Sequence, residues 1–126
     1  MKEHDRGISG SNLELADRFP HDEWILGDHP AVRRVGRHAE RAAHVGCTVL
    51  ISGETGTGKE VWAKLIHRLG RRSQRPFIPV NCAALTATLA ESQLFGHEKG
   101  AFTGALGAAL GVFRAAHTGI VFLDEI

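Results

Sequence analysis

The segment that most constrains the fold is a glycine-rich stretch, GETGTGK, at residues 53–59. It follows an apolar run at residues 48–52 (TVLIS), whose β-branched composition is typical of a strand buried in a parallel sheet. After Gly58, apolar residues recur at helical spacing until Gly70. A strand, a glycine-rich turn and a helix in this order are the context of a phosphate-binding loop.

The chemistry of such a loop depends on its backbone. Glycines allow successive N–H groups to turn inward and donate hydrogen bonds to phosphate oxygens, and the positive end of the helix dipole adds to the attraction. Lys59 supplies a charge that can reach the β and γ phosphates. Glu60 stands where the general motif has a magnesium-holding Ser or Thr. A plain glycine turn with an exposed lysine is the alternative.

The other predicted elements alternate between helix and strand. A helix begins at Pro30 and runs until Gly46, a second strand covers residues 77–80, Thr86 caps a short helix that reaches about Phe95, and a third strand covers residues 121–123. The order of these elements predicts an α/β fold, a three-layer sandwich around a mainly parallel sheet.

Two further segments carry candidate chemistry. The run VFLDE at residues 121–125 ends in two acids, so that Asp124 would hold magnesium and Glu125 would orient an attacking water; acids are also common at sheet ends without any catalytic role. The stretch GAFTGA at residues 100–105 reads as a turn, and its Phe102 either packs into the core or contacts a partner.

Composition excludes several classes of protein. Lys plus Arg number 15 against 14 Asp plus Glu, so no overall basic field indicates nucleic acid or an anionic membrane. Cys47 and Cys82 lack metal-binding spacing and are expected to be buried, reduced thiols. With neither a signal peptide nor an apolar run long enough to span a bilayer, we expect a cytoplasmic protein.

Four stretches together resemble the sigma-54-interacting AAA+ ATPase domain of bacterial enhancer-binding transcription activators, the NtrC-like family. They are GETGTGKE at 53–60, PFIPVNCAAL at 76–85, ESQLFGHEKGAFTGA at 91–105 and VFLDEI at 121–126. In that family a Glu after the P-loop lysine is usual, so Glu60 supports the resemblance, and GAFTGA is the diagnostic element.

The resemblance implies an ATP-binding P-loop NTPase that uses Mg²⁺. Asp124, in the Walker B element, would hold the metal through ATP, Glu125 would act in hydrolysis, and Asn81 would be the switch residue that restrains Glu125. The segment WILG at residues 24–27 resembles the one beside the adenine. The residues implied in ATP binding are Gly53, Glu54, Thr55, Gly56, Thr57, Gly58, Lys59 and Glu60.

The resemblance also implies partners. Phe102 and Thr103 would touch sigma-54 in the RNA polymerase holoenzyme, and the family works as a hexameric ring whose ATP hydrolysis drives open-complex formation. No direct DNA contact is expected from this segment. The partner-binding residues implied are Gly100, Ala101, Phe102, Thr103, Gly104 and Ala105.

The resemblance covers only the front half of such a domain. We expect a mobile leader at residues 1–22 and a partial AAA+ domain at residues 23–126, truncated after the Walker B strand. In the family another strand lies between the P-loop strand and the Walker B strand, so unpaired edges predict a marginally folded chain and a weak ATPase. The alternative function is a non-hydrolysing protein that binds sigma-54 or full-length homologues. An unrelated P-loop kinase or transferase is a third hypothesis.

Overall fold

The computed structural model describes residues 29–103 and 105–126. The predicted leader at residues 1–22, the predicted adenine-side segment at residues 24–27 and Gly104 lie outside the described residues. The chain divides into two units between Arg33 and Arg34. All contacts described below lie within the second unit, Arg34–Ile126.

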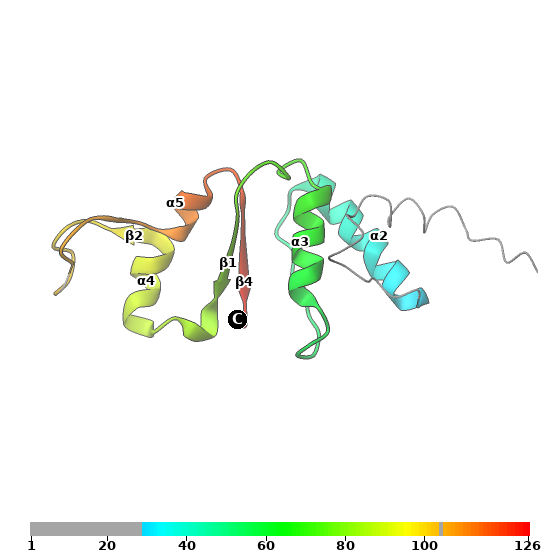
Figure 1. Ribbon diagram of the computed structural model, residues 1–126, viewed down its shortest axis with the longest axis horizontal. Coiled ribbons are helices and arrows are strands. Elements are labelled where there is room, and N and C mark those ends of the chain that lie inside the picture. Colours follow the sequence, from blue (N-terminus) through cyan, green and yellow to red (C-terminus); the bar gives the residue numbers. More distant parts are fainter. Residues whose placement is uncertain (1–28, 104) are drawn as a thin grey trace, which may run out of the picture. The chain divides into compact units, whose positions relative to one another are not determined.

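A pair of parallel strands forms the centre of this unit (Figure 1). β1 (Phe77–Asn81) pairs with β4 (Ile120–Asp124) in a register that runs from Phe77 opposite Ile120 to Asn81 opposite Asp124. The Phe77 and Phe122 rings stack with centroids 6.1 Å apart, so the pair also shares an aromatic contact. Both strands lie where the sequence predicts them, and they are parallel as predicted.

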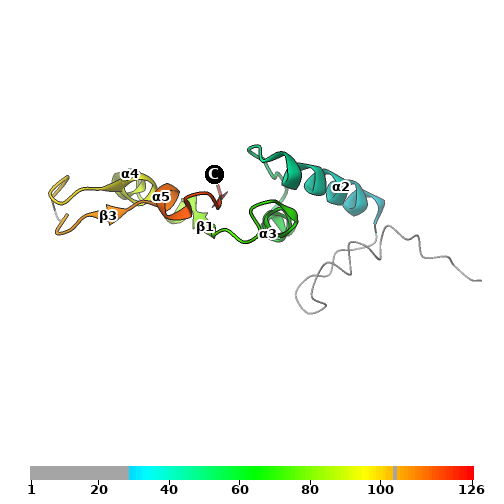
Figure 2. The same ribbon diagram turned by 90° about the horizontal axis from the view of Figure 1, so that it is seen from above.

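Helices lie on both sides of this strand pair (Figures 1 and 2). α3 (Lys59–Leu69) contacts β4 on one side, and α5 (Val112–Ala116) contacts both strands on the other, where it packs against α4 (Ala87–Phe95). α2 (Pro30–Val45) precedes them in the chain. The predicted helices at α2, α3 and α4 are confirmed, and so is the three-layer α/β arrangement.

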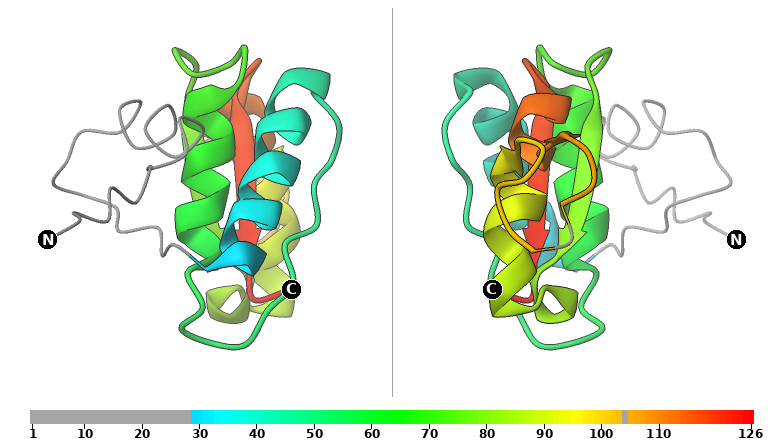
Figure 3. Two further views of the ribbon diagram at one scale, coloured as in Figure 1. Left: turned by 90° about the vertical axis from the view of Figure 1, so that its right-hand side faces the viewer. Right: turned by 90° about the vertical axis from the view of Figure 1, so that its left-hand side faces the viewer.

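A small hairpin, which the sequence did not predict, joins α4 to α5. β2 (Gly96–His97) pairs antiparallel with β3 (Ala109–Leu110), and a loop of residues 98–108 connects them (Figure 3, right). At its base, a Cβ on Gly111 would lie 2.2 Å from the backbone nitrogen of Gly96. Two glycines are therefore required for the ends of α4 and β3 to approach each other this closely.

The strand expected at residues 48–52 is a wrong prediction. This segment has no regular secondary structure, and its Leu50 is 79% exposed. The sheet formed by β1 and β4 has two strands, so across residues 29–103 and 105–126 the second edge of β4 has no strand beside it. A cavity of about 520 Å³ lies between Val49 and Ile51 on one side and Val121 on the other. Without a neighbouring strand, the apolar run has no ladder to join.

The core of the described residues is thin. Most of its buried apolar side chains are alanines, and the larger ones are a leucine and a valine. The buried residues are Ala39, Ala43, Ala63, Leu65, Val80, Ala105 and Ala116. Among the residues that the structure describes, no large side chain is completely buried. Cys47 is exposed and Cys82 is half-buried, which corrects the prediction of two buried thiols, because Cys47 begins the unpaired segment. So little burial favours a marginally stable chain.

Candidate functional site

The glycine-rich loop at residues 53–59 lies directly before α3, as predicted. Gly56 and Gly58 both have φ of +82°, a left-handed conformation that favours glycine. A Cβ on Gly53 would lie 2.8 Å from the hydroxyl oxygen of Thr57. The glycines at these three positions are thus needed for the loop conformation itself.

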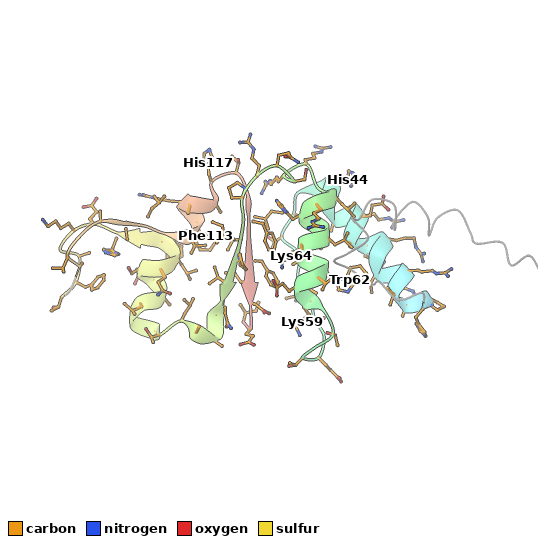
Figure 4. The ribbon with its side chains drawn as sticks, viewed as in Figure 1. His44, Lys59, Trp62, Lys64, Phe113 and His117 are labelled. Atoms are coloured by element: carbon orange, nitrogen blue, oxygen red, sulfur yellow. The ribbon has the colours of Figure 1, made fainter. Side chains whose placement is uncertain are left out.

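The carbonyl oxygen of Glu54 holds this loop together. It accepts hydrogen bonds from the Thr57 backbone N–H (3.3 Å), the Thr57 hydroxyl (2.7 Å) and the Lys59 ammonium (2.8 Å). The Lys59 ammonium also donates to the Gly53 carbonyl at 2.9 Å. Lys59 therefore points back into the loop from the first residue of α3, where Figure 4 labels it.

Backbone donors at the start of α3 are free to bind an anion. The first helical hydrogen bond runs from Trp62 N–H to the Gly58 carbonyl at 3.1 Å. In the part of the chain that the structure describes, the N–H groups of Gly58, Lys59 and Glu60 have no backbone acceptor. Free N–H groups, the helix dipole and an ammonium at one place form an anion site that suits phosphate.

Glu60 does not contribute its carboxylate to this site. The carboxylate forms an ion pair with Lys64 at 2.8 Å, one turn along α3, with both side chains substantially exposed. An acid in the first turn also interacts favourably with the helix dipole. Its predicted place in ATP binding therefore depends on its backbone N–H.

The predicted catalytic acids lie at the carboxyl end of β4. Asp124 is the last residue of the strand, and its carboxylate accepts a hydrogen bond from the Glu125 backbone N–H at 3.0 Å. Glu125 has φ of +55°, which is uncommon for a residue other than glycine, and it is exposed. Such backbone strain occurs often at functional sites.

Asn81 lies beside Asp124, because the two residues are opposite each other in the β1–β4 register. Its side-chain oxygen accepts a hydrogen bond from the Ala83 N–H at 2.9 Å and so caps η1 (Cys82–Ala84). Within residues 29–103 and 105–126, no hydrogen bond joins Asn81 to Glu125. The structure thus brings Asn81 to the predicted acids without forming the predicted restraint.

The donor set at this edge suits magnesium only in combination with a ligand. No three His, Cys, Asp or Glu side chains of the described residues gather into a metal site. Mg²⁺ is commonly held by one or two carboxylates together with substrate phosphates and water. Asp124 fits that requirement.

The GAFTGA stretch forms the tip of the loop between β2 and β3. Gly100, Ala101, Phe102 and Thr103 are exposed, whereas Ala105 is buried. Phe102 is 42% exposed, and its ring forms an edge contact with the His97 ring, with centroids 4.9 Å apart. Phe102 is therefore neither packed into the core nor wholly exposed.

Sequence reasoning missed two residues around this loop. His97 and Ser92 share a hydrogen bond of 2.6 Å between Nδ1 and the hydroxyl oxygen, and both lie in the stretch ESQLFGHEKGAFTGA. A polar residue before a glycine-rich turn is too ordinary a signal to single out either one.

The comparisons with known proteins agree with the loop and its setting. A family model described as the Sigma-54 interaction domain matches residues 25–126. The Nif-specific regulatory protein of Herbaspirillum seropedicae is 54% identical over 126 residues, covering 100% of this chain and 22% of that protein. The response regulator protein PilR of Pseudomonas aeruginosa is 47% identical over 111 residues, covering 88% of this chain and 25% of that protein.

Solved structures of NtrX from Brucella abortus have the same fold. The NtrX structure in complex with ATP has a TM-score of 0.72 at 31% identity, covering 92% of this chain and 24% of that chain. The NtrX structure in complex with ADP has a TM-score of 0.71 at 32% identity, covering 92% of this chain and 24% of that chain. The chain thus spans about a quarter or less of the proteins that it resembles. Among the helices that the structure describes, none has the length and apolar character needed to cross a bilayer.

Proposed function

Because the chain belongs to the Sigma-54 interaction domain family, we propose that it is the ATP-binding segment of a sigma-54-dependent transcription activator. In the complete activator, ATP hydrolysis would be coupled to open-complex formation by a hexameric ring in the cytoplasm. The single observation that carries the proposal is the P-loop, with its free N–H groups and its inward-pointing Lys59.

The nucleotide phosphates are bound at the N-terminus of α3. The N–H groups of Gly58, Lys59 and Glu60 donate to phosphate oxygens, and Lys59 exchanges its two carbonyl acceptors for charged ones. The NtrX complexes with ADP and ATP support this assignment, because those structures share the fold.

The hydrolytic groups belong to the carboxyl edge of the strand pair. Asp124 would hold Mg²⁺, which would supply charge stabilisation at the phosphates, and Glu125 would orient and deprotonate the attacking water. Asn81 lies opposite Asp124, the neighbour of Glu125 in the chain, and this register is the basis for proposing Asn81 as the switch residue for Glu125. Its present bond to Ala83 would then be exchanged for one to Glu125.

The exposed loop tip is the partner site. Phe102 and Thr103 present an aromatic ring and a hydroxyl at the end of the loop, and both residues are exposed. An exposed aromatic residue on a loop is a typical contact for a protein partner. The partner is sigma-54.

A second candidate is a non-hydrolysing protein that binds sigma-54 or full-length homologues. It is favoured by the cavity of about 520 Å³ beside β4, because within the described residues no strand lies next to the free edge of the strand that carries Asp124. Equal ATPase activity before and after Glu125→Ala would support it.

The test is thermal unfolding with and without Mg-ATP, for the unsubstituted chain and for Lys59→Ala. A ligand that binds only the folded state stabilises it by about 2.7 kcal/mol at 100 times its Kd. We expect this gain in the unsubstituted chain and its loss in Lys59→Ala.

Lys64→Ala is the matched control, because Lys64 lies on the same helix, is substantially exposed and forms an ion pair with the exposed carboxylate of Glu60. Its response to ATP should equal that of the unsubstituted chain. An ATP response that survives in Lys59→Ala, or that is absent from the unsubstituted chain, contradicts the proposal.

A further inference from the structure

Three side chains join α4 to the loop tip. Ser92 of α4 shares a hydrogen bond of 2.6 Å with Nδ1 of His97, the last residue of β2. The His97 ring in turn contacts the Phe102 ring at 4.9 Å with an interplanar angle of 63°. Ser92 and His97 are half-buried, whereas Phe102 is exposed, so the line runs outward from the helix to the loop tip.

Among residues 98–103 and 105–108, the backbone hydrogen bonds around the tip connect the loop only to itself. Gly100 N–H donates to the Ala105 carbonyl (3.0 Å), Ala101 N–H to the Glu98 carbonyl (3.1 Å) and Ala105 N–H to the Phe102 carbonyl (3.0 Å). These bonds fix the local shape of the turn. They do not determine where the Phe102 side chain lies relative to α4. The ring contact between His97 and Phe102 connects that side chain to the helix.

α4, which carries Ser92, follows closely in the chain after Asn81 at the carboxyl end of β1. Asn81, opposite Asp124, caps η1, and α4 follows after a short turn. The Leu89 and Ala90 N–H groups bond to the Thr86 carbonyl at 3.0 and 2.8 Å and so anchor the first turn of α4. The end of β1 and the first turn of α4 are thus each held by local hydrogen bonds, and the short stretch of chain between them connects Asn81 to the helix that carries Ser92.

We propose that His97 is the positioning residue for Phe102, joining the ring at the loop tip to α4 through Ser92. The two contacts use different parts of the imidazole, because Nδ1 serves Ser92 while the ring serves Phe102. The hydroxyl can donate to Nδ1 or accept from it, so the link persists in either tautomer. The proposal rests on the proposed function in one respect, that Phe102 contacts sigma-54.

The first test measures the position of the Phe102 ring directly, by ¹⁹F NMR of the chain labelled with 4-fluorophenylalanine. The chain has six phenylalanines, and the Phe102 resonance is assigned by its loss in Phe102→Leu. In the unsubstituted chain this resonance should differ from its position in urea. Ser92→Ala and His97→Asn should each move it most of the way toward the urea position.

Conservative variants separate positioning from a general effect on folding. Ser92→Thr keeps the hydroxyl and should restore the original resonance, whereas Gln93→Ala, at an exposed neighbouring position of α4, should leave it unchanged. The remaining phenylalanine resonances should stay in place throughout. A Phe102 resonance that is insensitive to Ser92→Ala, or that already lies at the urea position in the unsubstituted chain, overturns the proposal.

The second test is binding to purified sigma-54. Ser92→Ala and His97→Asn should weaken binding by about threefold to tenfold, the factor that corresponds to an aromatic edge contact. The stabilisation by Mg-ATP should not change. If Phe102→Leu has no effect on sigma-54 binding, the assigned contact between Phe102 and sigma-54 is wrong, while the NMR result still decides the role of His97.

Discussion

The segments at residues 48–52 and at β4 (Ile120–Asp124) have similar sequences, TVLIS and IVFLD, and different backbones. β4 is paired along its whole length with β1, and all five of its residues are half-buried. The other segment lies across the cavity of about 520 Å³, no strand of the described residues pairs with it, and Leu50 is 79% exposed. The difference shows that an apolar β-branched run becomes a strand only when a neighbouring strand accepts its hydrogen bonds.

The largest effect should come from disrupting the start of the β1–β4 pairing. A Cβ on Gly119 would lie 2.1 Å from the Pro76 carbonyl oxygen. This oxygen accepts a hydrogen bond from the Ile120 N–H (2.8 Å), which is the first bond between the two strands. Gly119→Ala should therefore lower the free energy of unfolding by about 3 kcal/mol, the upper range for overpacking. Urea denaturation measures it.

Gly107→Ala is the control for this substitution, because a Cβ there would meet no atom within 4 Å. Its free energy of unfolding should stay within about 0.5 kcal/mol of the original, as for other surface changes. Equal losses at the two positions would show that the β1–β4 contact does not limit stability.

The next largest effect should come from shortening a side chain in β4, compared with shortening one in residues 48–52. Phe122→Ala removes the ring that stacks on Phe77 and should cost about 2 kcal/mol, less than a fully buried ring because Phe122 is half-buried. Leu50→Ala should change the free energy of unfolding by less than about 0.5 kcal/mol, because Leu50 is already exposed. A loss in Leu50→Ala as large as that in Phe122→Ala would mean that residues 48–52 are packed in solution.

The smallest effect is a gain, at the turn before β4. His117, labelled in Figure 4, has φ of +48° and ψ of −109°, a conformation that favours glycine. His117→Gly should raise the free energy of unfolding by about 1 kcal/mol by relieving strain. His117→Ala keeps the Cβ and should give no such gain. Thermal unfolding of both variants measures the difference, and a gain in both would assign the effect to the imidazole instead.

How much of the fold the sequence predicts depends on whether an element is specified by its own residues or by its neighbours. Apolar residues recur at helical spacing along α2 and α3, and continuous apolar runs mark β1 and β4. These four elements lie where the sequence predicts them. The hairpin of β2 and β3 has two residues in each strand, too few to show alternation. Residues 48–52 carry a strong strand pattern, but pairing is a property of the neighbour as well as of the segment.

The residues of the candidate site likewise fall into those that a local sequence pattern predicts and those that only the fold brings together. The glycine-rich loop at residues 53–59 is predictable because its glycines, its lysine and the helix that follows are local in sequence. The place of Asn81 beside Asp124 depends on the strand register, which no local pattern specifies. The link from Ser92 through His97 to Phe102 depends on a hairpin that the sequence did not reveal.

The two carbonyl bonds of Lys59 have a consequence for ligand choice. Since the ammonium donates to the Gly53 and Glu54 carbonyls, two of its three N–H donors are engaged, and a ligand that binds more than one of them must replace a carbonyl. A neutral acceptor gains nothing by this exchange, whereas a phosphate gains because bonds to an ionised acceptor are roughly twice as strong. Exchange of acceptors at Lys59 therefore favours an ionised ligand over a neutral one, which is the selectivity that the proposed nucleotide-binding role requires.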